Sequence, residues 1–280
     1  MSRIPQTFQR LRAEGRTALM PYLTIGHPER DSTQMLVPAV VESGADLLEL
    51  GVPFSDPLAD GATVQASTQQ ALANGVNLRF CLDTVRLLRE RGIETPFAFM
   101  GYYNPIYQMG LERFAAAAQE AGVDGVIVPD LPPEEAVALD EALRQRDLDY
   151  IYLLAPTSDE SRIRLVAERA RGFIYLVSLM GVTGARAELP AELPAFIQRV
   201  REYTRGEIPL AVGFGIGTPE AARAVGALAD GVIVGSALVK RVADPSTAEH
   251  EARTFVQALR DGLDKRTMND EGRQTGRGRA

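Results

Sequence analysis

Two carboxylates stand in unusual surroundings in the first quarter of the chain. Glu49 interrupts the apolar run DLLELGVP, which predicts a buried strand, and Asp60 ends the Pro- and Asp-rich loop that follows. Burial disfavours a charged carboxylate and raises its pKa, which suits a group that both gives and takes a proton. Asp60 has more polar neighbours and should ionise more readily. Two acids with different pKa values can divide proton transfer and charge stabilisation between them.

Each acid also has an ordinary structural interpretation. Glu49 could be satisfied by a local hydrogen bond or ion pair, and Asp60 could cap the helix predicted after it. Apolar alternation predicts that Leu48 and Leu50 pack on helices, so that Glu49 points to the opposite side of the strand. Glu49 lies near the C-terminal end of its strand, where barrel active sites are built. That position, and the presence of a second acid, favour a functional pair.

Glycine-rich stretches suggest a second site, for an anion. SLMGVTGAR (178–186), VGFGIGTPE (212–220) and VGSALVK (234–240) each end a strand-like run. Backbone N–H groups and a helix N-terminus bind a phosphate without a basic side chain. The predicted phosphate site contains Gly213, Gly215, Gly235 and Ser236.

Short apolar runs alternate with amphipathic ones along most of the chain. The eight strand-like runs are 18–26, 46–53, 97–103, 124–130, 149–156, 172–179, 209–216 and 230–237, with helical patterns such as 111–122, 132–147, 158–170 and 218–229 between them. Ser158 and Thr218 are expected N-caps, and Pro219 suits a first helical turn. Eight parallel crossover units in about 250 residues predict an α/β fold, a single (β/α)8 (TIM) barrel. A doubly wound open sheet is the alternative, although no GxGxxG follows the first run.

The barrel domain is expected to span residues 1–265. Residues 266–280 are polar and lack apolar periodicity, which predicts a disordered tail.

Composition narrows the function classes. A net charge of −7 argues against a nucleic-acid or anionic-membrane surface. There is no signal-peptide-like start and no run of about 20 apolar residues, so we expect a cytoplasmic protein. Cys81 is the only cysteine, which excludes an internal disulfide. Two histidines, His27 and His250, make a histidine-rich metal centre improbable, and no metal is expected.

The motifs together resemble one family, the alpha chain of tryptophan synthase. LELGVPFSDPLADG, MGYYNPIYQMG, GVIVPDLPPEE, GVTGAR, GFGI and VGSA look like that family's motifs, over residues 3 to 263. The resemblance implies a cytoplasmic barrel lyase that cleaves indole-3-glycerol phosphate into indole and glyceraldehyde 3-phosphate. It also implies a beta chain that receives the indole, in an assembly of two alpha and two beta chains. Pyridoxal phosphate is expected on the beta chain and no cofactor on this one.

The resemblance also implies roles for single residues. Glu49 matches the proton carrier, Asp60 the partner of the indole ring nitrogen, and Tyr175 an active-site tyrosine. The substrate-binding positions would be Tyr22 and Tyr102 at the indole, Thr183 on a loop, and Gly184, Gly215, Gly235 and Ser236 at the phosphate. Asp56 and Pro57, in a rigid SDP turn, are candidate contacts with the beta chain, although a solvated turn is an equal alternative. Leu179, Met180 and Ala62 depart from the family pattern.

Two other functions compete with this one. Another phosphate-binding barrel, such as a sugar-phosphate epimerase or the synthase that makes indole-3-glycerol phosphate, would need metal-binding histidines or a catalytic lysine. The two lysines, Lys240 and Lys265, are poorly placed for that role. An inactive barrel kept as an allosteric subunit would have lost Glu49 or Asp60, and both are present.

Overall fold

The computed structural model describes residues 2–177, 190–213 and 215–274, with side chains up to Lys265. Thr183 and Gly184 lie outside the described residues, as do the departures Leu179 and Met180.

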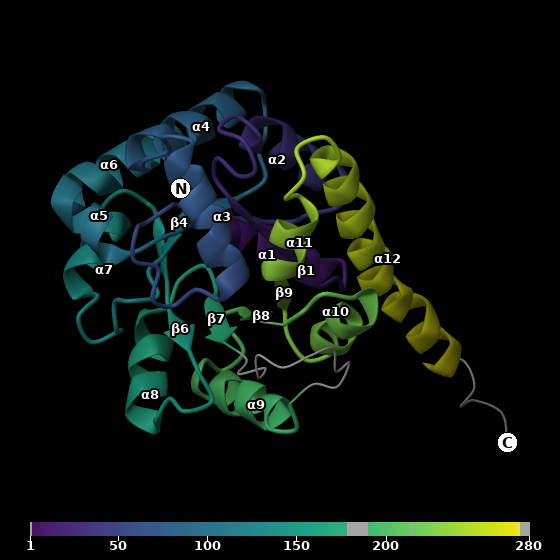
Figure 1. Ribbon diagram of the computed structural model, residues 1–280. Coiled ribbons are helices and arrows are strands. Elements are labelled where there is room, and N and C mark those ends of the chain that lie inside the picture. The colour runs from purple at the N-terminus through teal and green to yellow at the C-terminus, as the bar shows by residue number, and fades with distance from the viewer. Residues whose placement is uncertain (1, 178–189, 214, 275–280) are drawn as a thin grey trace, which may run out of the picture.

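Nine short parallel strands form one sheet, with helices around it (Figure 1). Their order is β5-β4-β3-β2-β1-β9-β8-β7-β6. The bounds are β1 Ala18–Thr24, β2 Leu48–Gly51, β3 Phe97–Met100, β4 Gly125–Ile127, β5 Asp149–Ile151, β6 Leu153–Leu154, β7 Ile174–Val177, β8 Leu210–Gly213 and β9 Gly231–Val234. Every predicted strand run holds a strand, shorter than the apolar run that predicts it.

A single segment, residues 149–154, brings the two ends of the sheet together. Its first half, β5, pairs with β4, and its second half, β6, pairs with β7. The two halves are separated only by Tyr152, so the nine strands correspond to the eight predicted runs. The sheet is therefore a nearly closed barrel, and the doubly wound alternative is wrong.

Twelve helices are found in the described part of the chain. They are α1 Ile4–Ala13, α2 Thr33–Glu42, α3 Ala62–Ala73, α4 Leu78–Glu90, α5 Tyr103–Met109, α6 Leu111–Ala121, α7 Val137–Arg144, α8 Glu160–Arg169, α9 Leu193–Tyr203, α10 Pro219–Gly226, α11 Ser236–Arg241 and α12 Ala248–Gln274. None of the described helices is long and apolar enough to cross a membrane.

Helix capping confirms one sequence prediction and corrects another. Thr218 caps α10, because its Oγ1 accepts the Ala221 N–H at 3.2 Å, and Pro219 occupies the first turn. Ser158 does not cap α8. Asp159 does, by accepting the Arg162 N–H at 2.8 Å, while Ser158 accepts the Ala155 N–H in the preceding turn. Both residues are good N-caps, so the one-residue shift was not decidable from composition.

The last helix runs further than the polarity pattern suggests. The C-terminal part of α12 extends beyond the body of the molecule (Figure 1), and the helix continues to Gln274, nine residues past the expected end of the barrel domain. Residues 275–280 lie outside the described residues, so the disordered tail stays a prediction.

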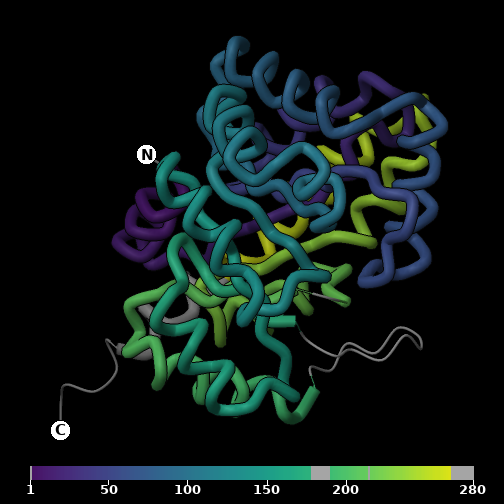
Figure 2. The backbone as a smooth tube through the Cα atoms, turned by 90° about the vertical axis from the view of Figure 1, so that its left-hand side faces the viewer, coloured from purple at the N-terminus to yellow at the C-terminus, as the bar shows by residue number. Residues whose placement is uncertain are grey.

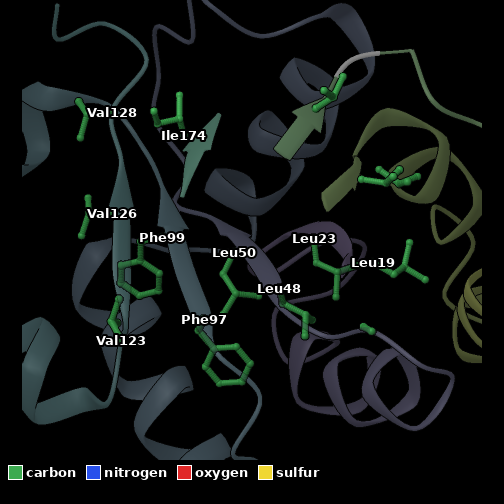
Figure 3. Close-up of a cluster of buried hydrophobic side chains, with 14 of the residues drawn as sticks. Leu19, Leu23, Leu48, Leu50, Phe97, Phe99, Val123, Val126, Val128 and Ile174 are labelled. Carbon is green, nitrogen blue, oxygen red and sulfur yellow. The ribbon is translucent and has the colours of Figure 1, made fainter. Parts of the chain in front are cut away.

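The core has two layers, which the alternation along each strand separates. Leu48, Leu50, Phe97 and Phe99 belong to the outer layer, between the strands and the helices (Figure 3). The inner layer fills the barrel and contains Leu47, Met20, Ala98, Ile127, Ile151, Tyr175, Ala211 and Ile233. The predicted outward direction of Leu48 and Leu50 is confirmed.

Helix α1 closes the N-terminal end of the barrel. Its apolar residues Ile4, Phe8 and Leu11 join the inner layer, and the Phe8 ring lies 5.8 Å from the Phe173 ring. Figure 2 shows α1, in purple, at the left-hand end of the molecule. The inner layer is therefore sealed at one end, and a site can open only at the other.

Aspartates fix the strands at this closed end. The carboxylates of Asp46, Asp124 and Asp230 each accept a backbone N–H from a neighbouring strand, and each aspartate N–H donates to the carbonyl of that same neighbour. The neighbours are Leu19 for Asp46, Phe97 for Asp124 and Leu210 for Asp230, with carboxylate distances of 3.0, 2.9 and 2.9 Å. Each reciprocal pair sets the register of two adjacent strands where they begin.

Arginines balance these carboxylates. Asp124, which is almost fully buried, pairs with Arg89 at 2.7 Å and with Arg3 at 3.1 Å, and Asp46 pairs with Arg260 at 3.0 Å. Arg89 also donates to carbonyls of the loop before β3 and lies over the Phe97 ring at 4.0 Å. A buried charge is tolerated only when it is paired and hydrogen-bonded in this way.

We predict that Asp124→Asn lowers the free energy of unfolding by about 3 kcal/mol or more, because two arginines lose their counter-charge and one amide N–H₂ then faces donors. Urea denaturation would measure it. Asp83→Asn is the matched control, since Asp83 pairs with Arg86 at 2.6 Å on the surface and should cost less than about 1 kcal/mol. Equal costs for the two variants would contradict this account of the closed end.

Candidate active site

Glu49 lies inside the barrel, on β2, and its side chain is 1% exposed. In the register of the sheet it stands between Tyr22 of β1 and Ala98 of β3. Its buried Oε1 has no hydrogen-bond partner among the described residues, and burial raises the pKa of Glu49 to about 8. The surroundings therefore favour a protonated acid at neutral pH. They do not favour the alternative, a carboxylate held by a local ion pair.

Asp60 ends the loop that joins β2 to α3. Gly61 is the N-cap of α3 and no side chain caps the helix, so Asp60 is not a helix cap. Burial raises the pKa of Asp60 to about 6, and a hydrogen bond from Tyr102 opposes that rise. Asp60 is therefore the stronger acid of the two, as the sequence predicted, and it is mostly ionised at neutral pH.

Tyr102 holds the Asp60 loop from the neighbouring strand. Its hydroxyl accepts the Ala59 N–H at 3.0 Å and donates to the Asp60 carboxylate, and its ring stacks on Phe54 at 5.3 Å. Tyr102 lies two residues after the end of β3, in the loop at the open end of the barrel.

Tyr22 and Tyr175 complete the inward-facing group, and glycines make room for both. A Cβ at Gly51 would lie 2.0 Å from the Tyr22 hydroxyl, and one at Gly213 would lie 2.2 Å from the Tyr175 hydroxyl. Gly213, predicted for the phosphate site, therefore has a steric role as well. Gly51 was not predicted, although it lies two residues from Glu49 on the same face of the strand.

The effects of these side chains on one another's pKa values show that they form one cluster. Burial is the main cause that raises the pKa of Tyr175, and the carboxylates of Glu49 and Asp60 raise it further. The same causes act on Tyr22, whose hydroxyl accepts a hydrogen bond from Thr24 at 3.2 Å. Three tyrosines and two acids thus lie together inside the open end. Beside them, a cavity of about 360 Å³ is lined by Tyr175, Ala59 and residues of the loops after β4 and β6.

The predicted phosphate residues within the described chain lie at the ends of β8 and β9, which are neighbours in the sheet. Gly215 has a φ of 78°, in the left-handed region that favours glycine. Gly235 is the N-cap of α11, and Ser236 is its first residue. In the described part of the chain no group of three His, Cys, Asp or Glu side chains could hold a metal ion.

Fold and site define a class: a (β/α)8 barrel with a cluster of two acids and three tyrosines at the C-terminal ends of its strands. The family model of the tryptophan synthase alpha chain matches residues 8–268. The chain belongs to this family, and it is a carbon–carbon lyase that cleaves indole-3-glycerol phosphate in tryptophan biosynthesis. The epimerase, the indole-glycerol-phosphate synthase and the inactive barrel are thereby rejected.

Individual relatives and solved structures agree with the family model. The alpha chain of Roseiflexus castenholzii is 55% identical over 262 residues, which cover 93% of this chain and 100% of that protein. That of Dehalococcoides mccartyi is 52% identical over 265 residues, 94% of this chain and 100% of that one. The crystal structure of the alpha subunit from Legionella pneumophila has a TM-score of 0.87 at 39% identity and covers 95% of this chain and 99% of its own.

The raised pKa of Glu49 has a consequence for stability. Its value in the folded chain, about 8, lies above the ordinary 4.5, so the folded state binds more protons between these values and stability falls as pH rises. We predict that Glu49→Gln becomes progressively more stable than wild type from pH 5 to pH 8, by roughly 2–4 kcal/mol in total. Urea denaturation at pH 5, 6.5 and 8 would measure the difference. A difference independent of pH would show that Glu49 ionises normally.

Proposed function

We propose that Glu49 carries the proton in this cleavage and that Asp60 stabilises the charge that develops. The observation that supports these roles most is the order of the two pKa values inside one cluster. With a pKa of about 8, Glu49 is mainly a neutral acid at pH 7, whereas Asp60, with a pKa of about 6, is mainly a carboxylate.

The chemistry needs both forms. The bond between indole C3 and the glycerol chain breaks only after C3 gains a proton, because the unprotonated ring carbon is a poor leaving group. Protonation puts positive charge on the ring nitrogen, where the Asp60 carboxylate stabilises it. As the bond breaks, its electron pair restores the indole ring and the adjacent hydroxyl becomes the aldehyde. Glu49, having given its proton to C3, accepts the hydroxyl proton and returns to its starting state.

The remaining site residues bind and orient the substrate. We assign Tyr22 and Tyr102 to the indole pocket, and Tyr175 to the reacting centre because both acids act on its hydroxyl. Thr183 is assigned to a substrate-facing loop. The phosphate is assigned to backbone donors, which need no cationic side chain, at Gly184, Gly213, Gly215, Gly235 and Ser236. Proton transfer between these groups accounts for the reaction, and we propose no cofactor and no metal on this chain.

The partner is a beta chain, with which this family works. We propose an assembly of two alpha and two beta chains in the cytoplasm, with pyridoxal phosphate on the beta chain and neither nucleic acid nor membrane as a partner. Asp56 and Pro57 are assigned to the contact. Leu58, beside them, supports this assignment because its side chain is 90% exposed at the open end of the barrel.

Glu49→Gln should reduce kcat for indole-3-glycerol phosphate at least about 100-fold and leave KM within about threefold, because it keeps the shape and removes proton exchange. Asp60→Asn should lose a similar factor, about 3 kcal/mol of charge stabilisation. Steady-state kinetics with Glu120→Gln, on the exposed face of α6, as control would test both. A Glu49→Gln variant that retained a tenth of wild-type kcat would reject the proton-carrier role.

A matching beta chain should raise kcat at least about tenfold, roughly 1.4 kcal/mol of barrier, with a smaller change in KM. The physical reason is that docking over the open end selects the loop positions that place Asp60 productively. Kinetics with increasing beta chain would measure the effect. If gel filtration shows the complex and kcat does not change, the alpha chain works independently of its partner.

A further inference from the structure

We propose that Gln65 is a positioning residue for Asp60: its side-chain amide, on the second turn of α3, donates to backbone carbonyls of the Asp60 loop and fixes that loop over the site. The proposal rests on the proposed role of Asp60.

The contacts define a clamp between a helix and the loop that precedes it. Nε2 of Gln65 lies 2.8 Å from the Asp60 carbonyl oxygen and 3.5 Å from the Pro57 carbonyl oxygen. The backbone N–H of Gln65 donates to the Gly61 carbonyl at 3.0 Å, which makes this residue part of the regular helix. One side chain therefore ties two points of the loop to α3.

The chemistry of the two neighbours settles which end of the amide faces the loop. Both are carbonyl oxygens, which can only accept. The opposite orientation of the amide would place Oε1 against two acceptors and leave all three oxygens without a proton. The amide N–H₂ group is thus required, and a side chain of the same shape without a donor cannot replace it.

The loop needs this clamp because its start is held by strand hydrogen bonds, whereas its end is not. At its start, the Val52 N–H donates to the Met100 carbonyl at 2.8 Å, in continuation of the strand. At its end, Gly61 offers no side chain to cap α3. The Tyr102 hydroxyl holds Ala59 and the Asp60 carboxylate from one side, and Gln65 holds the Asp60 backbone from the other.

The base of the clamp is itself fixed to the barrel. Ser67, two residues further along on the buried face of α3, donates to Thr24 Oγ1 of β1 at 2.7 Å, because the Thr24 proton is already used. Thr24 in turn donates to the Tyr22 hydroxyl. Polar contacts therefore connect the backbone of Asp60, through α3, to the strand beside Glu49.

Removal of the donor should release the end of the loop. Asp60 then occupies its productive position for a smaller fraction of the time, and its carboxylate becomes better hydrated. The first effect lowers kcat, and the second lowers the pKa of Asp60 from its raised value. KM should change little, because Gln65 lies on neither phosphate loop.

The test compares Gln65→Met with Gln69→Met, a matched substitution on the exposed face of the same helix. In Gln65→Met we expect kcat for indole-3-glycerol phosphate to fall about five- to thirtyfold, KM to stay within about twofold, and circular dichroism to show an intact fold. Gln65→Glu, which keeps the shape but loses the donor, should behave like Gln65→Met. Gln69→Met should match wild type.

A second readout does not depend on catalysis. The Asp60 carboxyl group can be titrated by carbon-13 NMR in each variant, and its pKa should be lower in Gln65→Met than in Gln69→Met. If kcat and the Asp60 titration are both the same in the two variants, the clamp is rejected. If the titration moves but kcat of Gln65→Met equals that of Gln69→Met, the clamp stands and the catalytic role of Asp60 fails.

Discussion

A buried carboxyl group, whose Oε1 has no hydrogen-bond partner among the described residues, is the constraint on which the rest of the site depends. Glu49 remains inside because it can bind a proton instead of a counter-ion. That solution works only if water is kept away, which the inner layer and α1 accomplish from below. It also needs a second acid that ionises more easily, and the wetter loop position supplies one in Asp60. The barrel thereby holds one acid neutral and the other charged within a single cluster.

Acidic side chains have opposite surroundings at the two ends of the barrel. At the closed end Asp46, Asp124 and Asp230 are paired with arginines and accept backbone N–H groups, so they act as structural anions. At the open end, no arginine of the described residues contributes to the raised pKa of Glu49 or of Asp60. Full pairing would stabilise the carboxylate and remove the acid that proton transfer requires. Rigidity is thus concentrated at the end that does no chemistry.

Local pattern was enough to predict the eight strand runs and the inward direction of Glu49, because both follow from a two-residue alternation. It could not predict contacts that depend on neighbours distant in sequence. The break at Tyr152, the place of Gly51 under a tyrosine and the link from Ser67 to Thr24 are of this kind. The choice of Asp159 over Ser158 as a cap depended on backbone angles that composition does not encode. The contact of Thr24 with Tyr22 could have been predicted, because residues two apart on a strand lie on the same face.

The position of α1 has a consequence for how the chain reaches this state. The helix lies at the start of the chain, yet its apolar face belongs to one buried cluster with residues as late as Ile233, and Arg3 donates to Asp124. None of these partners exists as a surface until most strands have paired. Docking of α1 therefore depends on contacts of large sequence separation, which are slow to form. We infer that the N-terminal helix docks late, and that Ile4, Phe8 and Leu11 stay exposed until the strands have paired.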